Sequence, residues 1–376
     1  MRIGIIGGGP GGLYTAVLAK RLDPRHEVVV WERDAADRTY GFGVIFSDPA
    51  LEVIGRADPR TRAALEPWLV RWNRMSVHHR GEAFTTAGLG FAAIARVSLL
   101  AVLRRWCLRS GVTVLHGRPA PPLERLAAEC DLVVAADGAH SATRTGRAGR
   151  FGTTLRPCAL RYAWLGADRA FDGMSFMIAE TAGGPVVAHA YPYADGRSTF
   201  LVEARADAAP AQESVQAPAV DRIARLFGEH LGGASLTAGR SRWSRFAVVR
   251  NRTWWDGNVV LLGDAAHTTH YSIGSGTALA MGDAVALTTA LREHSGLPAA
   301  LAAYEAARRP VAERMQQVAQ ASLEWFEGID AELAAGLPGL ATALFTRGGR
   351  VSLADVRDLE DPADVTGPLR AVAAGR

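Results

Sequence analysis

The first residues of the chain have the types and spacing that bind a dinucleotide. An apolar run, Ile3 to Ile6, leads into Gly7 to Gly12 (GGGPGG), and the helix-like stretch LYTAVLAKRL follows at once. In this context Gly7 permits a tight turn, Gly9 lets the backbone approach a pyrophosphate, and Gly12 lets the helix pack close to the strand. The start of the helix then offers free N–H groups and the positive end of its dipole to phosphates.

A carboxylate completes this pattern at the end of the next predicted strand. The apolar run Val28 to Trp31 ends in Glu32, about 20 residues after Gly12, where a carboxylate accepts hydrogen bonds from the adenosine ribose. The alternative is an ordinary glycine-rich turn beside a surface glutamate, and the pattern does not distinguish NAD from FAD. The cofactor-binding candidates of this segment are Gly7, Gly9, Pro10, Gly11, Gly12, Glu32 and Arg33.

Two further predicted strands end in an acidic residue beside a glycine. The run DLVVAA is followed by Asp137-Gly138, with Ser141 and Arg144 shortly after. The run NVVLL is followed by Gly263-Asp264, and Gly274-Ser275-Gly276-Thr277 then opens the helical stretch ALAMGDAVALTTAL. Each segment alone indicates only a strand and a turn.

The three motifs in this order resemble those of the FAD-dependent aromatic hydroxylases typified by 4-hydroxybenzoate hydroxylase, over most of the chain. The resemblance implies FAD, with Asp264 near the ribityl and pyrophosphate groups, Arg96 of RVSLLAVLRRWC holding the cofactor, and Asp137 in a turn that serves FAD and NAD(P)H. It also implies that NADH or NADPH reduces the flavin, whose C4a-hydroperoxide passes oxygen from O2 to an electron-rich ring. The segment Gly274 to Thr277 is expected beside the flavin pyrimidine edge, where N–H groups stabilise the reduced flavin.

Four segments resemble a narrower subgroup, which contains salicylyl-CoA 5-hydroxylase, the hydroxylase half of 2-aminobenzoyl-CoA monooxygenase, and protodeoxyviolaceinate monooxygenase. They are GFGVIFSD (41–48), HAYPY (189–193), HTTHYSIGSGT (267–277) and ASLEWFE (321–327). The resemblance implies hydroxylation of a salicylyl- or anthraniloyl-type thioester or acid, with an indole-type or other natural-product scaffold as the alternative. Ala278 stands where we expect lysine in CoA-thioester members, which counts against a CoA substrate. Flavin-dependent halogenation is disfavoured, because a WxWxIP-like segment and the lysine beyond the FAD site are both missing.

Four residues are candidates for contact with the substrate. His189, Tyr191 and Tyr193 alternate, so in an extended strand they share one face and can hydrogen-bond a phenol or an amine. Pro192 restricts them to an edge strand or the end of a strand. His270, in the loop beside the predicted flavin site, can polarise or deprotonate a ring hydroxyl. The alternatives are sheet packing for the first three and a turn cap for His270.

We expect an α/β fold that positions these residues. In it a Rossmann-type FAD-binding domain is interleaved with a β-sheet-rich substrate domain, and a C-terminal helical segment follows. We expect residues 1–70, 96–150 and 245–330 in the first domain, 71–95 and 151–244 in the second, and 331–376 as a helical tail. Asp195-Gly196 predicts a hairpin, and the text from Leu297 predicts a long helix interrupted by Pro310.

Composition places the chain among globular proteins and suggests a small-molecule ligand. It has 376 residues, 48% hydrophobic and 21% charged, and its net charge of +4 comes from scattered arginines. This pattern disfavours nucleic acid and mildly favours an anionic ligand. The three separated cysteines indicate neither a disulfide framework nor a metal site. Without a signal peptide or an apolar membrane-spanning run, we expect a cytoplasmic protein without a membrane partner.

Overall fold

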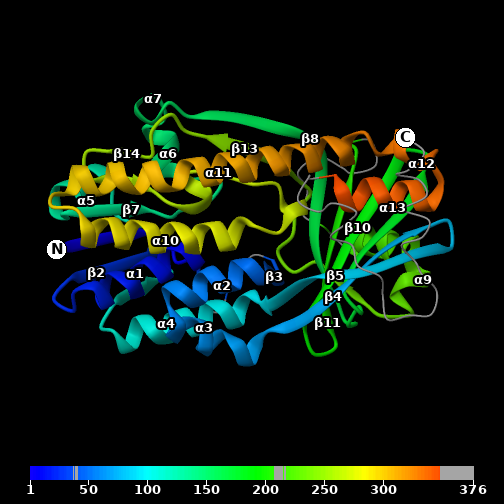
Figure 1. Ribbon diagram of the computed structural model, residues 1–376, viewed down its shortest axis with the longest axis horizontal. Helices are drawn as coiled ribbons and strands as arrows, with labels where there is room; N and C mark the ends of the chain where they lie inside the picture. Colours follow the sequence, from blue (N-terminus) through cyan, green and yellow to red (C-terminus); the bar gives the residue numbers. More distant parts are fainter. Residues whose placement is uncertain (37, 39–40, 207–214, 216, 348–376) are drawn as a thin grey trace.

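The computed structural model describes residues 1–36, 38, 41–206, 215 and 217–347 of the chain. Two β-sheets lie side by side in it, with helices packed around both (Figure 1). The predicted helical tail, 331–376, falls in part outside the described residues.

The first sheet has the Rossmann-type order that the glycine-rich turn predicts. Its strands follow the order β14-β15-β7-β1-β2-β6, and all neighbours are parallel except β14 with β15. The strands at its centre are apolar and buried, as expected for parallel strands covered on both faces. The bounds are β1 (Arg2–Ile6), β2 (Glu27–Glu32), β6 (Thr113–His116), β7 (Leu132–Ala135), β14 (Trp255–Asp256) and β15 (Val259–Leu261).

Several helices enclose this sheet and share its hydrophobic core. The helices of this half are α1 (Pro10–Leu22), α2 (Asp48–Ala57), α3 (Pro59–Leu65), α4 (Arg96–Arg109), α5 (Leu123–Glu129), α6 (Ala142–Gly146), α7 (Ala148–Phe151) and α10 (Gly276–Glu293), with 3-10 turns η1 (Glu66–Trp68), η2 (Gly263–Ala265) and η3 (Tyr271–Ile273). Pro10 occupies the first turn of α1, where its missing N–H breaks no hydrogen bond.

The second sheet is longer and mostly antiparallel. Its order is β12-β8-β11-β10-β9-β4-β5-β3, with β13 paired to β8 and a parallel pair between β4 and β9. Asp195-Gly196 joins β10 to β11, which confirms the predicted hairpin. The bounds are β3 (Gly43–Ser47), β4 (Val70–His79), β5 (Glu82–Ala95), β8 (Thr154–Ala167), β9 (Met174–Thr181), β10 (Gly184–Ala194), β11 (Arg197–Ala204), β12 (Leu236–Thr237) and β13 (Ser244–Arg250).

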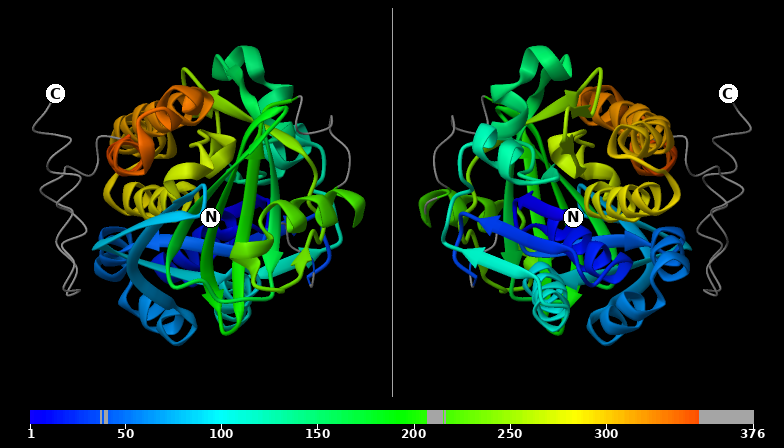
Figure 2. Two further views of the ribbon diagram at one scale, coloured as in Figure 1. Left: turned by 90° about the vertical axis from the view of Figure 1, so that its right-hand side faces the viewer. Right: turned by 90° about the vertical axis from the view of Figure 1, so that its left-hand side faces the viewer.

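The two faces of this sheet have different neighbours (Figure 2). One face packs on α8 (Ala217–Leu226) and α9 (Gly228–Leu231) around Phe200 and Phe227. The other packs at one end on α11 (Leu297–Glu327), α12 (Ile329–Leu333) and α13 (Gly336–Thr346). The rest of that second face is left to line a cavity.

The division into two domains stays a prediction, and two strands pair differently from what its ranges imply. Strands β3 and β13 lie in ranges that were expected in the first domain, but they pair with β5 and β8 of the second sheet. Helix α11 runs past both sheets, as Figure 1 shows, which confirms the predicted long helix. The predicted interruption at Pro310 is wrong, because the helix continues through that residue. None of the helices in the described part of the chain is long and apolar enough to cross a membrane.

Candidate active site

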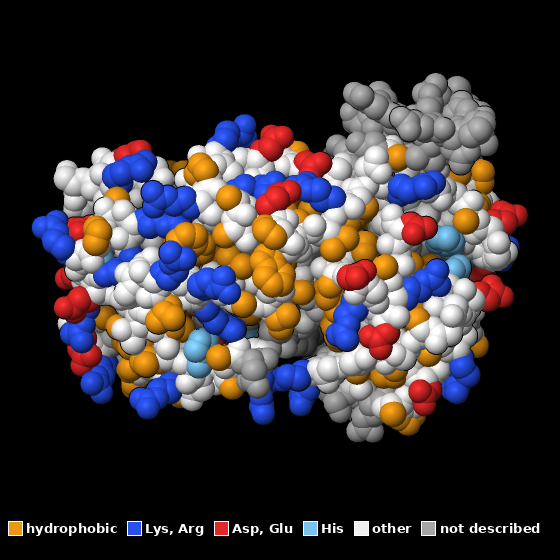
Figure 3. All heavy atoms as spheres, turned by 90° about the horizontal axis from the view of Figure 1, so that it is seen from below, with side chains coloured by type: hydrophobic (Ala, Val, Ile, Leu, Met, Phe, Trp, Pro, Cys, Tyr) orange, Lys and Arg blue, Asp and Glu red, His pale blue; other side chains and the backbone are white. Residues whose placement is uncertain are grey.

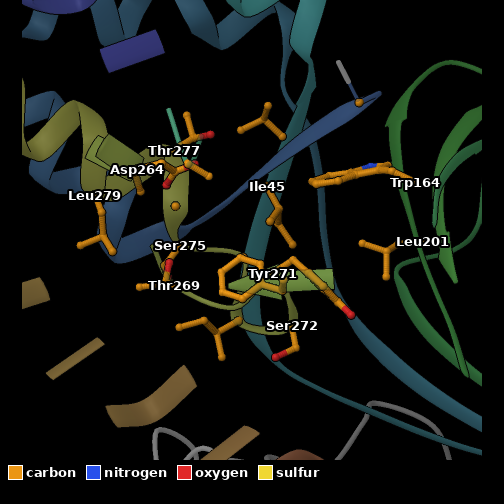
Figure 4. A pocket seen from close by; sticks show the side chains of 18 of the residues that line it. Ile45, Trp164, Leu201, Asp264, Thr269, Tyr271, Ser272, Ser275, Thr277 and Leu279 are labelled. Carbon is orange, nitrogen blue, oxygen red and sulfur yellow. The ribbon is translucent and has the colours of Figure 1, made fainter. Parts of the chain in front are cut away.

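A cavity of about 1730 Å³ lies between the two halves of the molecule. From below, the surface is hollowed between these halves, with basic side chains beside the hollow (Figure 3). In the close view of Figure 4, Asp264 and Thr277 lie on one side of the cavity, Trp164 and Leu201 on the other, and Ile45 and Tyr271 between them. The carboxyl ends of the parallel strands therefore meet one face of the second sheet across this space.

The glycine-rich turn between β1 and α1 is shaped by close backbone contacts. A Cβ atom on Gly7, which has φ +105°, would lie 2.3 Å from the Ala136 carbonyl oxygen. A Cβ on Gly12 would lie 2.1 Å from the Gly7 carbonyl oxygen, and one on Gly11 would lie 2.7 Å from Leu262 Cδ2. By contrast, a Cβ on Gly9 would meet nothing within 4 Å. The space beside Gly9, where the sequence predicts a pyrophosphate, is therefore free of protein atoms.

Glu32 lies at the carboxyl end of β2, directly behind this turn. Its carboxylate accepts hydrogen bonds from the backbone N–H groups of Gly8, at 2.7 Å, and Asp34, at 2.8 Å. A carboxylate has further acceptor capacity for ribose hydroxyls. The neighbouring Arg33 lines the cavity.

The turn after β7 carries a buried polar atom without a protein partner. Asp137 Oδ2 accepts a hydrogen bond from the Thr143 N–H at 3.1 Å, while Oδ1 is buried and has no partner among the described residues. Nearby, Arg144 is only 2% exposed and donates to the carbonyl oxygens of Ala139, at 2.6 Å, and Ala265, at 3.2 Å. Arg144 thus ties the Asp137 turn to the Asp264 turn, a role that sequence reasoning did not assign.

Asp264 follows β15 in the turn η2 and opens onto the cavity. The side chain is open to the cavity, but the protein around it displaces water and raises the pKa of the carboxyl, while the nearby charges of His267 and Arg96 partly offset this. Arg96, at the start of α4, lines the same cavity, and burial lowers its pKa while Asp264 and Glu32 act in the opposite direction. The structure therefore brings Arg96 and Asp264, which are far apart in sequence, to one site.

A buried ionic cluster holds the Asp264 turn against α10. Asp283, which is fully buried, accepts hydrogen bonds from His267 Nε2 at 2.8 Å, the Gly263 N–H at 3.0 Å and Arg308 Nε at 2.7 Å. Sequence analysis missed Asp283 and Arg308. The sequence feature that could have indicated Asp283 is an acidic residue inside the otherwise small and apolar stretch ALAMGDAVAL.

The predicted helix start forms the floor of the cavity next to Asp264. Helix α10 begins at Gly276, and residues Gly274 to Thr277 all line the cavity. Gly274 has φ +62°, and a Cβ there would lie 2.5 Å from Ile45 Cγ2, so glycine is required for β3 to approach this turn. The start of α10 thus lies at the cavity, and contact of its N–H groups with a flavin stays a prediction.

These features fit FAD on structural grounds. The open space at Gly9, the unpaired Oδ1 of Asp137 and the carboxylate of Asp264 at the cavity wall are what a dinucleotide would fill or satisfy. Glu32 and the turn Gly7 to Gly12 would hold the adenosine and pyrophosphate, and the start of α10 would face the flavin. When bound, FAD supplies the redox chemistry of oxygen activation, which side chains alone do not provide.

Alternate residues of the second sheet form the opposite wall of the cavity. Trp164 of β8, Phe176 of β9, His189 and Tyr191 of β10, and Leu201 of β11 line it. Their register makes them neighbours on one face, with His189 opposite both Leu201 and Phe176. The predicted sharing of one face by His189 and Tyr191 is therefore present.

The predicted substrate residues differ in their access to the cavity. Tyr191 donates its hydroxyl hydrogen to the Gly43 carbonyl oxygen at 3.0 Å and stacks on Trp72. Tyr193 is buried nearby but is not part of the cavity wall. His270 is 2% exposed and lies behind the wall, where its Nδ1 is 2.9 Å from Ser272 Oγ. Burial lowers the pKa of His270 to about 4.

Removing the Asp264 carboxylate tests the placement of the cofactor. We expect Asp264→Ala to weaken FAD binding about tenfold to a hundredfold, because a hydrogen bond to a charged group contributes roughly 1.5 to 3 kcal/mol. Titration of the apoprotein with FAD, followed by flavin fluorescence, measures this. Glu129→Ala removes an exposed carboxylate that pairs with Arg125 away from the cavity and provides the control. Unchanged affinity in Asp264→Ala would show that the cofactor lies elsewhere.

Comparison with known proteins agrees with this geometry. Residues 124–319 match the family model described as "FAD binding domain". A solved structure of 2-methyl-3-hydroxypyridine-5-carboxylic acid oxygenase has the same fold, with a TM-score of 0.73 at 19% identity, covering 93% of this chain and 98% of that chain. The chain belongs to this family of FAD-binding domains, and the predicted α/β fold class is confirmed.

Three curated relatives are similar over most of this chain. The 3-hydroxy-4-methyl-anthranilyl-[aryl-carrier protein] 5-monooxygenase of Streptosporangium sibiricum is 48% identical, over 95% of this chain and 97% of its own. The salicyloyl-CoA 5-hydroxylase of a Streptomyces species is 42% identical over 87% of this chain, but the match spans only 65% of that longer protein. The protodeoxyviolaceinate monooxygenase of Chromobacterium violaceum is 30% identical, over 88% of this chain and 90% of its own.

The predicted family resemblance is thereby confirmed, including the likeness to the salicylyl-CoA and protodeoxyviolaceinate enzymes. The chain is an FAD-dependent monooxygenase, as the sequence motifs predicted. The likeness to 2-aminobenzoyl-CoA monooxygenase stays a prediction.

Proposed function

We propose that the protein hydroxylates the ring of an aromatic acid held as a thioester, of the anthraniloyl or salicylyl type. The observation that carries this proposal is the cavity, in which an FAD site faces a wall of aromatic and polar side chains on the second sheet. The relatives at 48% and 42% identity, whose names specify a carrier-bound and a CoA-bound aryl group, support the thioester.

Positive charge along the cavity also supports an anionic thioester arm. Arg242 and Arg245 line the cavity, are exposed, and form no ion pair with a residue that the structure describes. Phosphopantetheine, the arm shared by CoA and carrier proteins, brings a phosphate that arginine binds well. Ala278 lines the cavity where we expected lysine in CoA-thioester enzymes, so we favour a carrier protein over CoA.

We propose NADH or NADPH as the reductant and O2 as the co-substrate, as the family chemistry requires. A cytoplasmic location stays a prediction. His189 and Tyr191 are the proposed substrate contacts on the sheet, with Tyr193 and His270 supporting them from behind the wall.

The second candidate is hydroxylation of an indole-type scaffold. The similarity to protodeoxyviolaceinate monooxygenase over 88% of this chain favours it, and a cavity of about 1730 Å³ has room for FAD and a larger ring system. Substrate-stimulated NAD(P)H oxidation, measured with product analysis, separates the candidates. The panel contains free aryl acids, their CoA thioesters, carrier-bound thioesters and indoles. Turnover of indoles alone would overturn the thioester proposal.

Substitutions at the substrate wall are expected to uncouple the reaction. Tyr191→Phe and His270→Ala should still consume NAD(P)H but release more hydrogen peroxide and less hydroxylated product, with unchanged FAD affinity. A shift of about 1 Å in a reacting group can reduce the productive step on the order of a hundredfold. The ratio of product to NAD(P)H consumed measures the effect. Tyr304→Phe removes a buried tyrosine hydroxyl that bonds the Leu261 carbonyl oxygen outside the cavity wall, and it is the matched control. Wild-type coupling in both test variants would reject the proposed roles.

A further inference from the structure

A glutamate that the sequence analysis did not single out lies behind the substrate wall. Glu203 of β11 is 1% exposed, and in the described part of the chain no arginine or lysine forms an ion pair with it. One carboxylate oxygen, Oε1, lies 2.8 Å from His189 Nε2, and the other, Oε2, accepts the Tyr271 hydroxyl hydrogen at 2.5 Å. A buried carboxylate without a full counter-ion is unfavourable, so its retention at this place requires an explanation.

We propose that Glu203 is a positioning residue that fixes the proton of His189 on Nε2, so that Nδ1 can accept a proton from the hydroxyl or amino substituent of the substrate ring. The inference rests on the proposed aromatic hydroxylation. It adds to that function the group that receives the substrate proton and the residue that orients it.

The geometry on both sides of the imidazole supports this assignment. An ionised carboxylate only accepts hydrogen bonds, so His189 must donate from Nε2, and in the neutral ring Nδ1 is then the acceptor. His189 lines the cavity, and Nδ1 makes no hydrogen bond to any residue that the structure describes. Nδ1 has no hydrogen-bond partner there but is not fully buried, so it keeps some exposure on a residue that lines the cavity.

The ionised form of Glu203 is maintained by its neighbours. Burial alone would raise the pKa of Glu203, but the His189 ring and the Tyr271 hydroxyl hold the pKa below its ordinary value. The polar and titratable groups that face this cluster from the surrounding elements are Tyr271 and His270 of the η3 segment, Cys158 and Tyr162 of β8, and Arg347 after α13. Phe176 and Phe326 cover the His189 ring at 5.0 and 4.9 Å between centroids.

The proposed proton transfer from the substrate to His189 accounts for every bond and for the electron pair. The O–H bond of a ring hydroxyl breaks before oxygen transfer, or the N–H bond of a ring amino group breaks as the oxygen adds to the ring. An N–H bond forms at Nδ1, and the imidazolium is stabilised by Glu203. The substituent keeps the electron pair and gives it to the ring, which makes the ring more reactive toward an electrophilic oxygen donor. The same division of roles operates wherever a buried carboxylate orients a catalytic histidine.

His270 is less suited to accept the proton. Its ring lies behind the wall, between Phe246 at 5.1 Å and Tyr271 at 3.9 Å, and its low pKa makes it a weak base at neutral pH. Its position supports Tyr271, whose ring projects into the cavity (Figure 4). His189 is thus the better-placed base among the two predicted histidines.

The test uses the FAD-loaded protein and Glu203→Gln, which keeps the size of the side chain but removes its charge. The matched control is Glu180→Gln, because Glu180 Oε1 also lies 2.8 Å from a histidine Nε2, that of His79, away from the cavity. Nitrogen-15 NMR of histidine-labelled protein, with the His189 signals assigned by His189→Gln, reports which ring nitrogen carries the proton. The pH profile of kcat/KM with the aryl thioesters reports proton acceptance.

We expect wild-type His189 to carry its proton on Nε2, Glu203→Gln to lose this preference, and Glu180→Gln to leave it unchanged. We also expect Glu203→Gln to lower kcat/KM about tenfold to a hundredfold and to change the pH profile, with FAD affinity retained. A wild-type proton on Nδ1, or an unchanged pH profile in Glu203→Gln, would overturn the proposal. If no aryl compound is turned over, the proposed function fails, while the NMR result still decides whether Glu203 sets the proton of His189.

Discussion

Replacing Asp283 by alanine is expected to lower the free energy of unfolding by about 3–5 kcal/mol, because it leaves three hydrogen-bond donors, two of them on cationic or polar side chains, without their acceptor. Asp283 is fully buried and receives hydrogen bonds from His267, Arg308 and the Gly263 N–H. The loss should also reduce FAD loading, since Gly263 precedes Asp264 in the turn that faces the cavity. Chemical denaturation and the FAD content of the purified variant measure the two effects.

An ion pair nearer the surface provides the control. Asp256 pairs with Arg147 at 3.0 Å and Arg150 at 3.3 Å, with its own side chain 22% exposed. We expect Asp256→Ala to cost only about 0.2–1 kcal/mol, as solvated pairs generally do. Equal losses of unfolding free energy in the two variants would show that the buried Asp283 cluster stabilises the fold no more than an ion pair near the surface.

The Asp283 contribution should depend on pH in a defined direction. Burial opposes ionisation of Asp283, but His267 and Arg308 hold its pKa below the ordinary value. The stabilisation is therefore fully present above the ordinary aspartate pKa and is lost as the pH falls through the lower folded-state pKa. The difference in stability between wild type and Asp283→Asn should shrink over that acidic range, and a constant difference would contradict this account.

The second large effect is expected in the glycine-rich turn, where two neighbouring glycines should respond differently. A Cβ on Gly12 would lie 2.1 Å from the Gly7 carbonyl oxygen, and backbone at this position cannot move without separating α1 from β1. We expect Gly12→Ala to lower the free energy of unfolding by about 1–3 kcal/mol, the usual range for overpacking. Urea unfolding of the apoprotein measures it.

Gly9→Ala should leave the fold intact and weaken only the cofactor. Gly9 has φ −74°, which alanine adopts readily, and a Cβ there meets no protein atom within 4 Å. The added methyl group would occupy the space we assign to the pyrophosphate, so FAD affinity should fall by about tenfold or more. Wild-type FAD affinity in Gly9→Ala would show that the pyrophosphate does not approach this turn.

Local sequence signals were enough to predict which turns meet at the cavity on the side of the first sheet. The residues from Gly7 to Glu32 and the two acid-glycine turns each follow a strand along the chain, so their spacing alone indicates how they meet. The pairing of β3 and β13 with the second sheet was missed. Such pairing depends on register between distant segments, and Gly43 lies opposite Ala95 without any local sign of it.

The buried acids were missed for a related reason. Glu203 is the second-last residue of the stretch STFLVEA, where an acid normally marks the exposed end of a strand, and its partner Tyr271 is far away in sequence. Asp283 likewise depends on His267 and Arg308. Only the contacts made in the folded chain distinguish such buried carboxylates from surface ones.

Because side chains alternate across the second sheet, the residues that contact a substrate can change without changing those that pack the sheet on its helices. Trp164 and Leu201 face the cavity, while the adjacent Leu165 and Val202 pack against α8 and α9. A library restricted to the cavity-facing positions would vary the binding chemistry at every second residue and leave the packing layer untouched. Natural divergence in this family can use the same freedom, so that substrate range drifts while the flavin half stays constant.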